Sequence, residues 1–297
     1  MEYIDKTKGA LQAHSLLSDF LSRCKIDGFS VSDDLYSKMK SDRDTNILNA
    51  DTTYNILKKQ LLEESNNRCC YCMRNIKMDN DTTLEHIIPN KVSSKEEYNQ
   101  YLSFGFSWPK VIFSKDFLSN SSFDLDVFPH TIAYENLIPS CNGKFAKNNS
   151  NDVHAHDKRE PKCCNNKRGN KFIIPFVLNL QMVREFKYRK DGYVTWPVNS
   201  CLDEDERIRL SQNHKDTIEE LGLNCPELVA IRKIWYFLSS EKIDCSINNR
   251  DDIIYSILKD EFLIEEEISM LLNFSNDNYW CLLNEYNYFN DISKFHI

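Results

Sequence analysis

The spacing of the cysteines limits the structures open to this chain more than any other feature. Two residues separate Cys69 from Cys72, so both sulfurs can reach one metal ion at about 2.3 Å from a tight turn. Cys141 and Cys164 are the best candidates for the two thiols that would complete a tetrahedral zinc site. A site with four protein ligands has no open position, so it would hold the fold together rather than perform a reaction.

The identity of the fourth ligand stays open at this point. Cys70 and Cys163 are neighbours that could replace a thiol, and His154 or His156 could do the same. Cys164 is preferred because the asparagine after it then falls in register with a motif described below. The long polar loop before it is tolerable, since the entropy cost of closing a loop grows slowly with length. Free buried cysteines are the alternative to a zinc site.

The compartment in which the protein is expected decides whether its cysteines are metal ligands or form disulfides. The chain has 297 residues, of which 41% are hydrophobic, 28% are charged and 11 are cysteines. We find no signal-peptide pattern and no apolar run near the roughly 20 residues that span a bilayer, so we expect a cytoplasmic protein. A reducing compartment favours thiolate ligands or buried thiols over disulfides.

Charge is distributed unevenly along the chain. The net charge is −8, yet the segment 158–190 has ten Lys or Arg against two acids. From residue 201 to the end, twenty acids face nine bases. A basic strip suits phosphate binding, and an acidic tail suggests a separate surface for another partner.

Periodicity predicts an α+β fold in three parts. These are an N-terminal helical segment (1–66), a core with the cysteines and insertions (67–200) and an acidic helical region (201–297). Apolar residues at helical spacing predict helices at 8–24, 51–64, 93–102, 206–221, 226–239, 251–263 and 265–274. The segment 162–172 can make a short helix.

Strand signals are fewer and shorter. We expect strands at 74–78 and 83–88 to form a hairpin across the MDND turn, and a hairpin or edge strand at 186–197. The segment 136–139 is too short to be assigned a strand. The insertion 103–130 contains Trp108 and His130, which we interpret as packing residues.

Glu85 and His86 form an acid-histidine doublet some twelve residues after the first cysteine pair. A carboxylate suits Mg²⁺, and an imidazole that is neutral near pH 7 suits a general base. Adjacent strand residues point to opposite faces, so the two can cooperate only where the backbone bends. The doublet is therefore a candidate for metal-assisted hydrolysis of a phosphodiester.

Further polar residues can complete such a site. Asn136 has an amide able to pin the loop that carries His86, and Asn165 has a carbonyl oxygen able to bind the metal. Arg168, with Lys167 and Lys171 nearby, could hold backbone phosphates.

These residues resemble the HNH endonucleases, which have a ββα-metal fold. The family pattern is C-x-x-C, acid-His-Ile-x-Pro, Asn-Leu, Cys and Cys-His/Asn-x-x-Lys-Gly. The matching segments are Cys69–Cys72, Glu85–Pro89, Asn136–Leu137, Cys141 and Cys164–Gly169. Asn165 stands where many members have histidine, Arg168 stands where most have lysine, and the last thiol pair is split.

The HNH resemblance implies roles for individual residues. His86 would be the general base, Glu85 and Asn165 would bind a catalytic Mg²⁺ or Mn²⁺, and Asn136 would be the central asparagine. The structural zinc would be bound by Cys69, Cys72, Cys141 and Cys164.

The layout of residues 68–233 is similar to one group of HNH proteins, the PtuB-type nucleases of bacterial Septu anti-phage systems, some of which accompany retrons. It includes the long stretch between the last two thiols and the segments DGYVTWP and TIEELGLNCPELVAIRK. This resemblance implies a partner ATPase and an effector that cuts DNA or RNA, and we expect DNA to be the substrate.

Two other functions are compatible with the same residues. A zinc-stabilised module could bind nucleic acid or protein without catalysis, but such a module needs none of Glu85, His86, Asn136 and Asn165. A scaffold could recruit an ATPase through its helices after its nuclease site has decayed.

Overall fold

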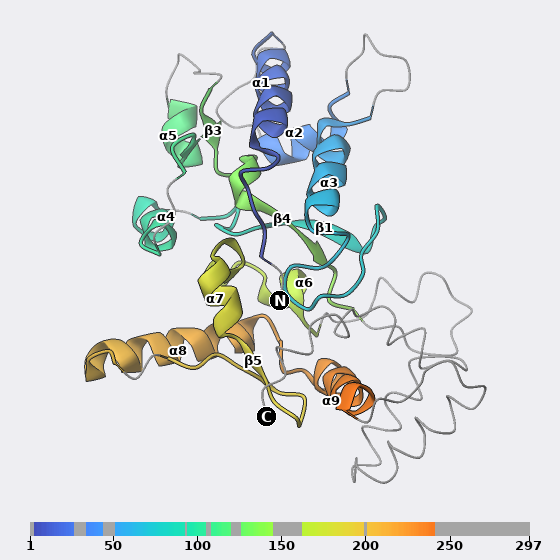
Figure 1. Cartoon of the computed structure of the whole chain (residues 1–297). Coiled ribbons are helices and arrows are strands. Elements are labelled where there is room, and N and C mark those ends of the chain that lie inside the picture. The colour runs from blue at the N-terminus through green and yellow to red at the C-terminus, as the bar shows by residue number, and fades with distance from the viewer. Residues whose placement is uncertain are drawn as a thin grey trace, which may run out of the picture.

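The computed structural model describes residues 3–26, 34–43, 51–92, 94–104, 108–119, 126–144, 162–198 and 201–240, with side chains to residue 233. This part of the chain mixes helices with small two-stranded sheets, as predicted for an α+β protein (Figure 1). The predicted helices at 251–263 and 265–274, and also His154 and His156, lie outside the described residues.

Two of the N-terminal helices were predicted and one was missed. The helices are α1 (Ala10–Ile26), α2 (Leu35–Ser41) and α3 (Thr53–Glu64). The side chain of Thr52 begins α3 by accepting a hydrogen bond from the Asn55 amide at 3.1 Å. Asp34 caps α2 in the same way, in a polar segment for which the sequence pattern predicted no helix.

The central sheet is an antiparallel pair of β1 (Thr82–His86) and β4 (Leu137–Cys141). Its register places Thr82 opposite Cys141 and His86 opposite Leu137. All five residues of β4 are buried, which explains why so short a segment is stable as a strand. The short helix α6 (Cys164–Arg168) packs against β4.

The predicted hairpin between 74–78 and 83–88 is wrong. The backbone after the first cysteine pair turns back on itself, because the Cys69 amide bonds the Arg74 carbonyl at 2.8 Å and the Ile76 amide bonds the Asn67 carbonyl at 2.8 Å. Residues 74–76 therefore close the turn that carries Cys69 and Cys72. The strand at 82–86 pairs instead with β4, which lies more than fifty residues later in the chain.

The insertion and the segment after α6 contain further short elements. The insertion has α4 (Lys95–Leu102), β2 (Val111–Ile112), α5 (Ser114–Ser119) and β3 (Phe128–Pro129), and a 3₁₀ turn (Tyr134–Asn136) leads into β4. His130 is buried and the half-buried Trp108 packs against the core, as expected. After α6 come a 3₁₀ turn (Phe176–Leu178), α7 (Leu180–Glu185), the predicted hairpin of β5 (Lys187–Tyr188) and β6 (Val194–Thr195), α8 (Glu204–Glu220) and α9 (Pro226–Ser240).

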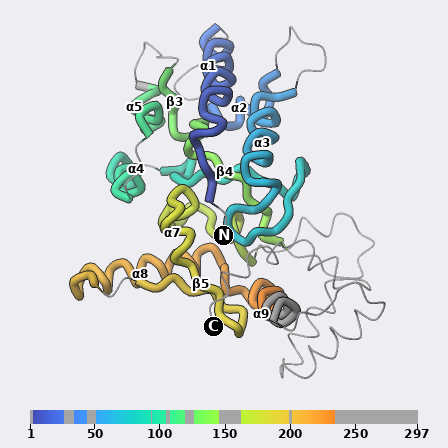
Figure 2. The backbone as a smooth tube through the Cα atoms, viewed as in Figure 1, coloured from blue at the N-terminus to red at the C-terminus, as the bar shows by residue number. Residues whose placement is uncertain are grey.

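The helices are arranged in two groups about the central sheet. Figure 1 shows α1, α2 and α3 on one side of the β1–β4 pair and α7, α8 and α9 on the other, and the backbone trace in Figure 2 follows the same division. Buried residues of α1 and α3 share a core with Leu84 of β1 and Leu137 of β4. The N-terminal helices thus pack against the central sheet.

A second core contains residues from all three predicted parts of the chain. Leu62 of α3, Cys69 and Leu228 of α9 belong to this one buried cluster. The division of the chain into three parts stays a prediction. Among the helices in the described part of the chain, none combines the length and apolar character that crossing a bilayer requires.

Candidate metal centre and adjoining cavity

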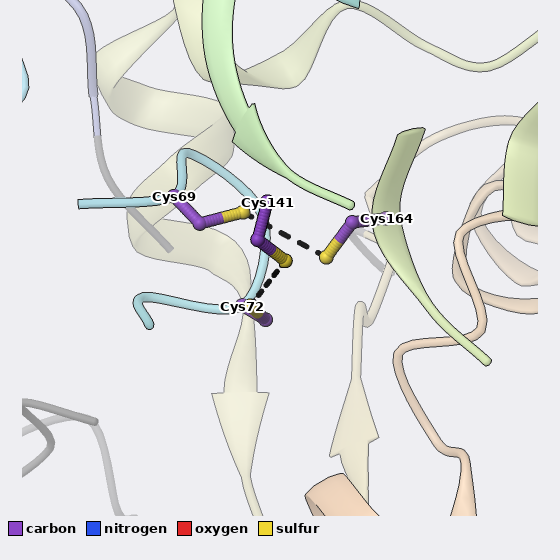
Figure 3. A group of neighbouring side chains, drawn as sticks. All are labelled: Cys69, Cys72, Cys141 and Cys164. Atoms are coloured by element: carbon purple, nitrogen blue, oxygen red, sulfur yellow. Dashed lines mark hydrogen bonds between the residues drawn. The ribbon is translucent and has the colours of Figure 1, made fainter. Parts of the chain in front are cut away.

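Four buried thiols meet at one end of the central sheet. Cys69 and Cys72 come from the turn before β1, Cys141 ends β4 and Cys164 begins α6 (Figure 3). Their sulfur atoms all lie within 4.8 Å of one another. The Cys69–Cys164 distance is 3.7 Å and the Cys72–Cys141 distance is 3.6 Å.

This arrangement fits a tetrahedral metal ion. Zinc–sulfur bonds of about 2.3 Å in a tetrahedron place the sulfurs about 3.8 Å apart, close to the separations found here. Four buried cysteines can therefore hold an ion such as zinc, and these are the four that the sequence predicted. A bound ion would join the cysteine turn, β4 and α6.

The fourth position is occupied by Cys164 rather than by a neighbouring thiol. Cys70 and Cys163 are buried, but neither belongs to the set of four. The Cys164 backbone has a φ of 60°, and its amide bonds the Leu221 carbonyl at 2.8 Å. The backbone near α8 thus helps to hold Cys164 in a conformation that L-residues seldom adopt.

The four thiols differ in how readily they ionise: the pKa is lowered at Cys69 and Cys141, whereas burial raises the pKa of Cys72 and of Cys164. Hydrogen bonds from the thiols of Cys163 and Cys164 lower the pKa of Cys141 to about 5. Since thiolate is the form of cysteine that binds metal, such a shift favours metal binding at neutral pH.

A cavity of about 270 Å³ lies beside β1 and α6. The residues that line it include Glu85, His86 and Asn165. The structure therefore brings together the doublet and the asparagine that the sequence marked as one site. Glu85 and His86 are neighbours on a strand, and both reach the cavity where β1 ends.

Glu85 is buried and paired with Arg168. The guanidinium donates hydrogen bonds to the Glu85 carboxylate, to the His86 carbonyl at 2.8 Å and to the Ile87 carbonyl at 2.7 Å. Burial raises the pKa of Glu85 to about 7, although the charge of Arg168 acts in the opposite direction. The ion pair holds the end of β1 against α6.

His86 has a defined tautomer. Its Nε2 lies 2.8 Å from the Thr131 carbonyl, which can only accept, so Nε2 carries a proton. Burial lowers the pKa of His86 to about 4, so the ring is neutral at pH 7. The lone pair then lies on Nδ1, and the ring is held in place by the edge contact with Tyr36 at 4.5 Å between centroids.

Asn136 and Asn165 make different contacts. The Asn136 amide accepts from the Ile88 amide at 2.7 Å and donates to the carbonyls of Ile88 and His130, so it fixes the backbone just after His86, as predicted. Asn165 donates from Nδ2 to Thr83 Oγ1 at 3.0 Å, which ties α6 to β1. Its Oδ1 accepts no hydrogen bond from the described residues and is available as a ligand oxygen.

The expectation that Arg168 contacts phosphates is wrong. Its side chain is buried, and its guanidinium also bonds the Lys171 carbonyl and the Tyr101 hydroxyl, so its donors are used within the protein. Nothing in the sequence indicated that the Arg168 side chain is buried, because its neighbours include Lys167, Lys171 and other basic residues. Lys167 is exposed, and Lys171 pairs with Glu220 at 2.5 Å.

The sequence pattern did not predict the contribution of the N-terminal helices to the cavity. Tyr36 and Lys40 from α2 and Tyr54 from α3 line the same cavity as Glu85 and His86. Tyr36 and Lys40 are four residues apart, so they lie on one face of a helix. This spacing is the one feature of the sequence that could have pointed to them. It is common, however, and it indicates a shared face only where a helix is predicted.

Comparisons with known proteins add no relative. A scan against family models and searches of curated proteins and of solved structures find no match for this chain.

Proposed function

We propose that this chain is an HNH endonuclease that hydrolyses phosphodiester bonds of nucleic acid with the help of a divalent cation. The observation that carries the proposal is the cavity shared by Glu85, His86 and Asn165 next to four clustered thiols. The order of elements, two antiparallel strands followed by a short helix, supports equating β1, β4 and α6 with a ββα-metal core.

His86 is suited to the role of general base. A neutral ring with its proton on Nε2 has one lone pair, on Nδ1, with which to accept a proton from water. The Thr131 carbonyl would stabilise the ring when it becomes positive, because it already accepts from Nε2. Asn136 and Tyr36 keep the ring and its backbone in place.

Glu85 and Asn165 are the candidate ligands of the cation. Their side-chain oxygens match the preference of Mg²⁺ and Mn²⁺ for oxygen donors, and both residues line the cavity. When bound, such a cation offsets the charge that develops on the phosphate and leaving oxygens. Thr83 orients the Asn165 amide, and Arg168 orients the Glu85 carboxylate.

A zinc-stabilised binding module is the alternative. The Glu85–Arg168 ion pair favours this alternative in one respect, because the pair explains the buried Glu85 carboxylate without a bound cation. A binding module would need neither the free lone pair of the neutral His86 ring nor the free side-chain oxygen of Asn165. We therefore prefer the nuclease proposal to the binding module.

The Septu resemblance extends the proposal to a biological setting. We infer an effector nuclease of anti-phage defence that works in the cytoplasm with a partner ATPase, in some systems beside a retron, and that cuts DNA rather than RNA. Lys167, exposed at α6, supports contact with the nucleic-acid backbone.

Plasmid cleavage tests the proposed activity. Purified zinc-containing protein, alone and with the product of the adjacent gene, is incubated with supercoiled DNA and Mg²⁺, Mn²⁺ or no added cation. We expect nicking that requires the cation, and an Asn165→Ala variant that needs a higher cation concentration. Cleavage that is independent of added cation, or absent under every condition, would count against the proposal.

A further inference from the structure

The N-terminal helices supply one wall of the cavity that contains Glu85, His86 and Asn165. This wall consists of Tyr36, Lys40 and Tyr54, and we call it the tyrosine–lysine wall. It comes from α2 and α3, which precede the cysteine turn and are not part of the β1, β4 and α6 unit. The catalytic cavity is therefore incomplete without the N-terminal segment.

Lys40 is held in place by the two aromatic rings. Its Nζ lies 4.4 Å from the ring centroid of Tyr36 and 5.4 Å from that of Tyr54. The two rings meet edge to face, with centroids 5.9 Å apart and an interplanar angle of 82°. Cation–π contacts of this kind restrict a long side chain that would otherwise be free.

The wall is fixed relative to His86. The Tyr36 hydroxyl donates to the Leu84 carbonyl of β1 at 3.2 Å, and the Tyr36 ring contacts the His86 ring. Lys40 is also close enough for its positive charge to lower the pKa of His86, after the effects of burial, the Thr131 bond and Arg168. The ammonium group thus has a set position near the base.

The charge of Lys40 acts on the Asp34 carboxylate, but no ion pair neutralises it in the described part of the chain. Lys40 is exposed and makes no ion pair there, whereas Lys95, Lys171 and Lys215 each pair with an acid. Asp34, the nearby acid at the start of α2, is bonded to two backbone amides and to the Ser37 hydroxyl. Glu85, the acid that lines the cavity, is bonded to Arg168.

We propose that Lys40, held over Tyr36 and Tyr54, binds a backbone phosphate of the nucleic-acid strand beside the cleavage position. The inference rests on the proposed nuclease function and names the residue that anchors its substrate. The cavity volume of about 270 Å³ lies just below the range of about 300–1,000 Å³ for small-molecule pockets, so it suits a phosphodiester group while the rest of the strand lies outside. Tyr36 and Tyr54 act as positioning residues for Lys40.

Salt-dependent binding separates this role from a general charge effect. The full-length zinc-containing protein is titrated with a fluorescent oligonucleotide as single-stranded DNA, duplex DNA or RNA, in buffer without added divalent cation. Lys40→Gln is compared with Lys59→Gln, which removes an exposed lysine of α3 that does not line the cavity.

We expect Lys40→Gln to raise Kd about tenfold for at least one of these strands and to reduce the slope of log K against log salt by about 0.7–0.9, the loss of one phosphate contact. Lys59→Gln should change neither value. Tyr54→Leu should weaken binding about threefold, and Tyr54→Phe should restore it because the ring is retained.

The outcomes distinguish the two proposals. If the wild type cleaves nucleic acid and Lys40→Gln keeps the wild-type Kd and salt slope, the proposed phosphate contact of Lys40 is wrong and the proposed nuclease function stands. If Lys59→Gln weakens binding as much as Lys40→Gln, the effect is one of net charge and the proposed phosphate contact is again wrong. If the wild type neither binds nor cleaves any of the strands, the nuclease function and the phosphate contact are both overturned.

Discussion

Arg168 joins the candidate base and the candidate cation ligand to α6. Its hydrogen bonds reach the side chain of Glu85 and the carbonyls of His86 and Ile87, at the point where β1 ends. A buried guanidinium with its donors satisfied costs less to desolvate than an isolated charge, but its removal leaves each acceptor unpaired. We therefore assign Arg168 to positioning rather than to phosphate binding.

Replacing Arg168 by methionine should destabilise the protein by about 3–5 kcal/mol, the usual cost of removing one partner of a buried ion pair. The reason is that the buried Glu85 carboxyl and the carbonyls of His86 and Ile87 would lose their hydrogen-bond donors, and Glu85 would have to bind a proton or stay charged without compensation. Urea denaturation of the zinc-containing protein measures the loss. The double variant Glu85→Gln/Arg168→Met also lacks the buried carboxylate. Its loss of unfolding free energy should therefore be smaller than the sum of the losses in the two single variants. Additive losses would show that the two side chains do not interact.

His130 should make stability depend on pH. Burial lowers its pKa to about 4, and its Nδ1 accepts from the Ser114 amide at 3.1 Å. The unfolded chain binds a proton below about pH 6.5 while the folded chain does not, so this contribution to stability is complete above pH 6.5 and is lost as the pH falls toward 4. Between pH 7 and pH 5 we expect a loss of about 2 kcal/mol from this group.

His130→Asn is the comparison for this pH effect, because Asn Oδ1 can still accept from the Ser114 amide. The free energy of unfolding of the wild type should fall by about 2 kcal/mol more than that of the variant between the two pH values. Parallel pH profiles would mean that the His130 ring is not kept neutral by the fold.

The elements around the four thiols come from distant parts of the sequence. The cysteine turn, the end of β4 and the start of α6 contribute two, one and one thiol. The sequence predicted the ligands because C-x-x-C spacing and the HNH-like register are local signals. It could not predict that 82–86 pairs with 137–141, because the pairing depends on a buried strand that only tertiary contacts stabilise.

Loss of one thiol should release the metal. We expect wild-type protein to contain one zinc ion per chain, by mass spectrometry, and Cys164→Ser to contain little, since a serine hydroxyl is a poor replacement for a thiolate. The accompanying loss of stability should exceed the roughly 1 kcal/mol of an ordinary point mutation, because metal binding is linked to folding. Cys163→Ser is the control and should retain the ion. Equal zinc contents in all three proteins would place the metal elsewhere.

At the scale of the whole molecule, the sequence predicted the residues of the candidate site better than it predicted their surroundings. Glu85, His86, Asn136 and Asn165 could be selected because a known motif gives each a position. Tyr36, Lys40 and Tyr54 could not, because their relation to β1 depends on how α2 and α3 pack on the sheet. Arg168 was assigned to the surface because its basic neighbours are there, whereas its own side chain turns inward to Glu85.

The central claim is that His86 activates water in the cavity that it shares with Glu85 and Asn165. The most direct measurement is the single-turnover rate of cleavage of a labelled oligonucleotide by wild-type and His86→Ala protein, both with equal zinc content and equal strand binding. The account predicts that the variant is slower by about 10²–10⁴-fold, the usual contribution of a general base. Equal rates for the two proteins would contradict it.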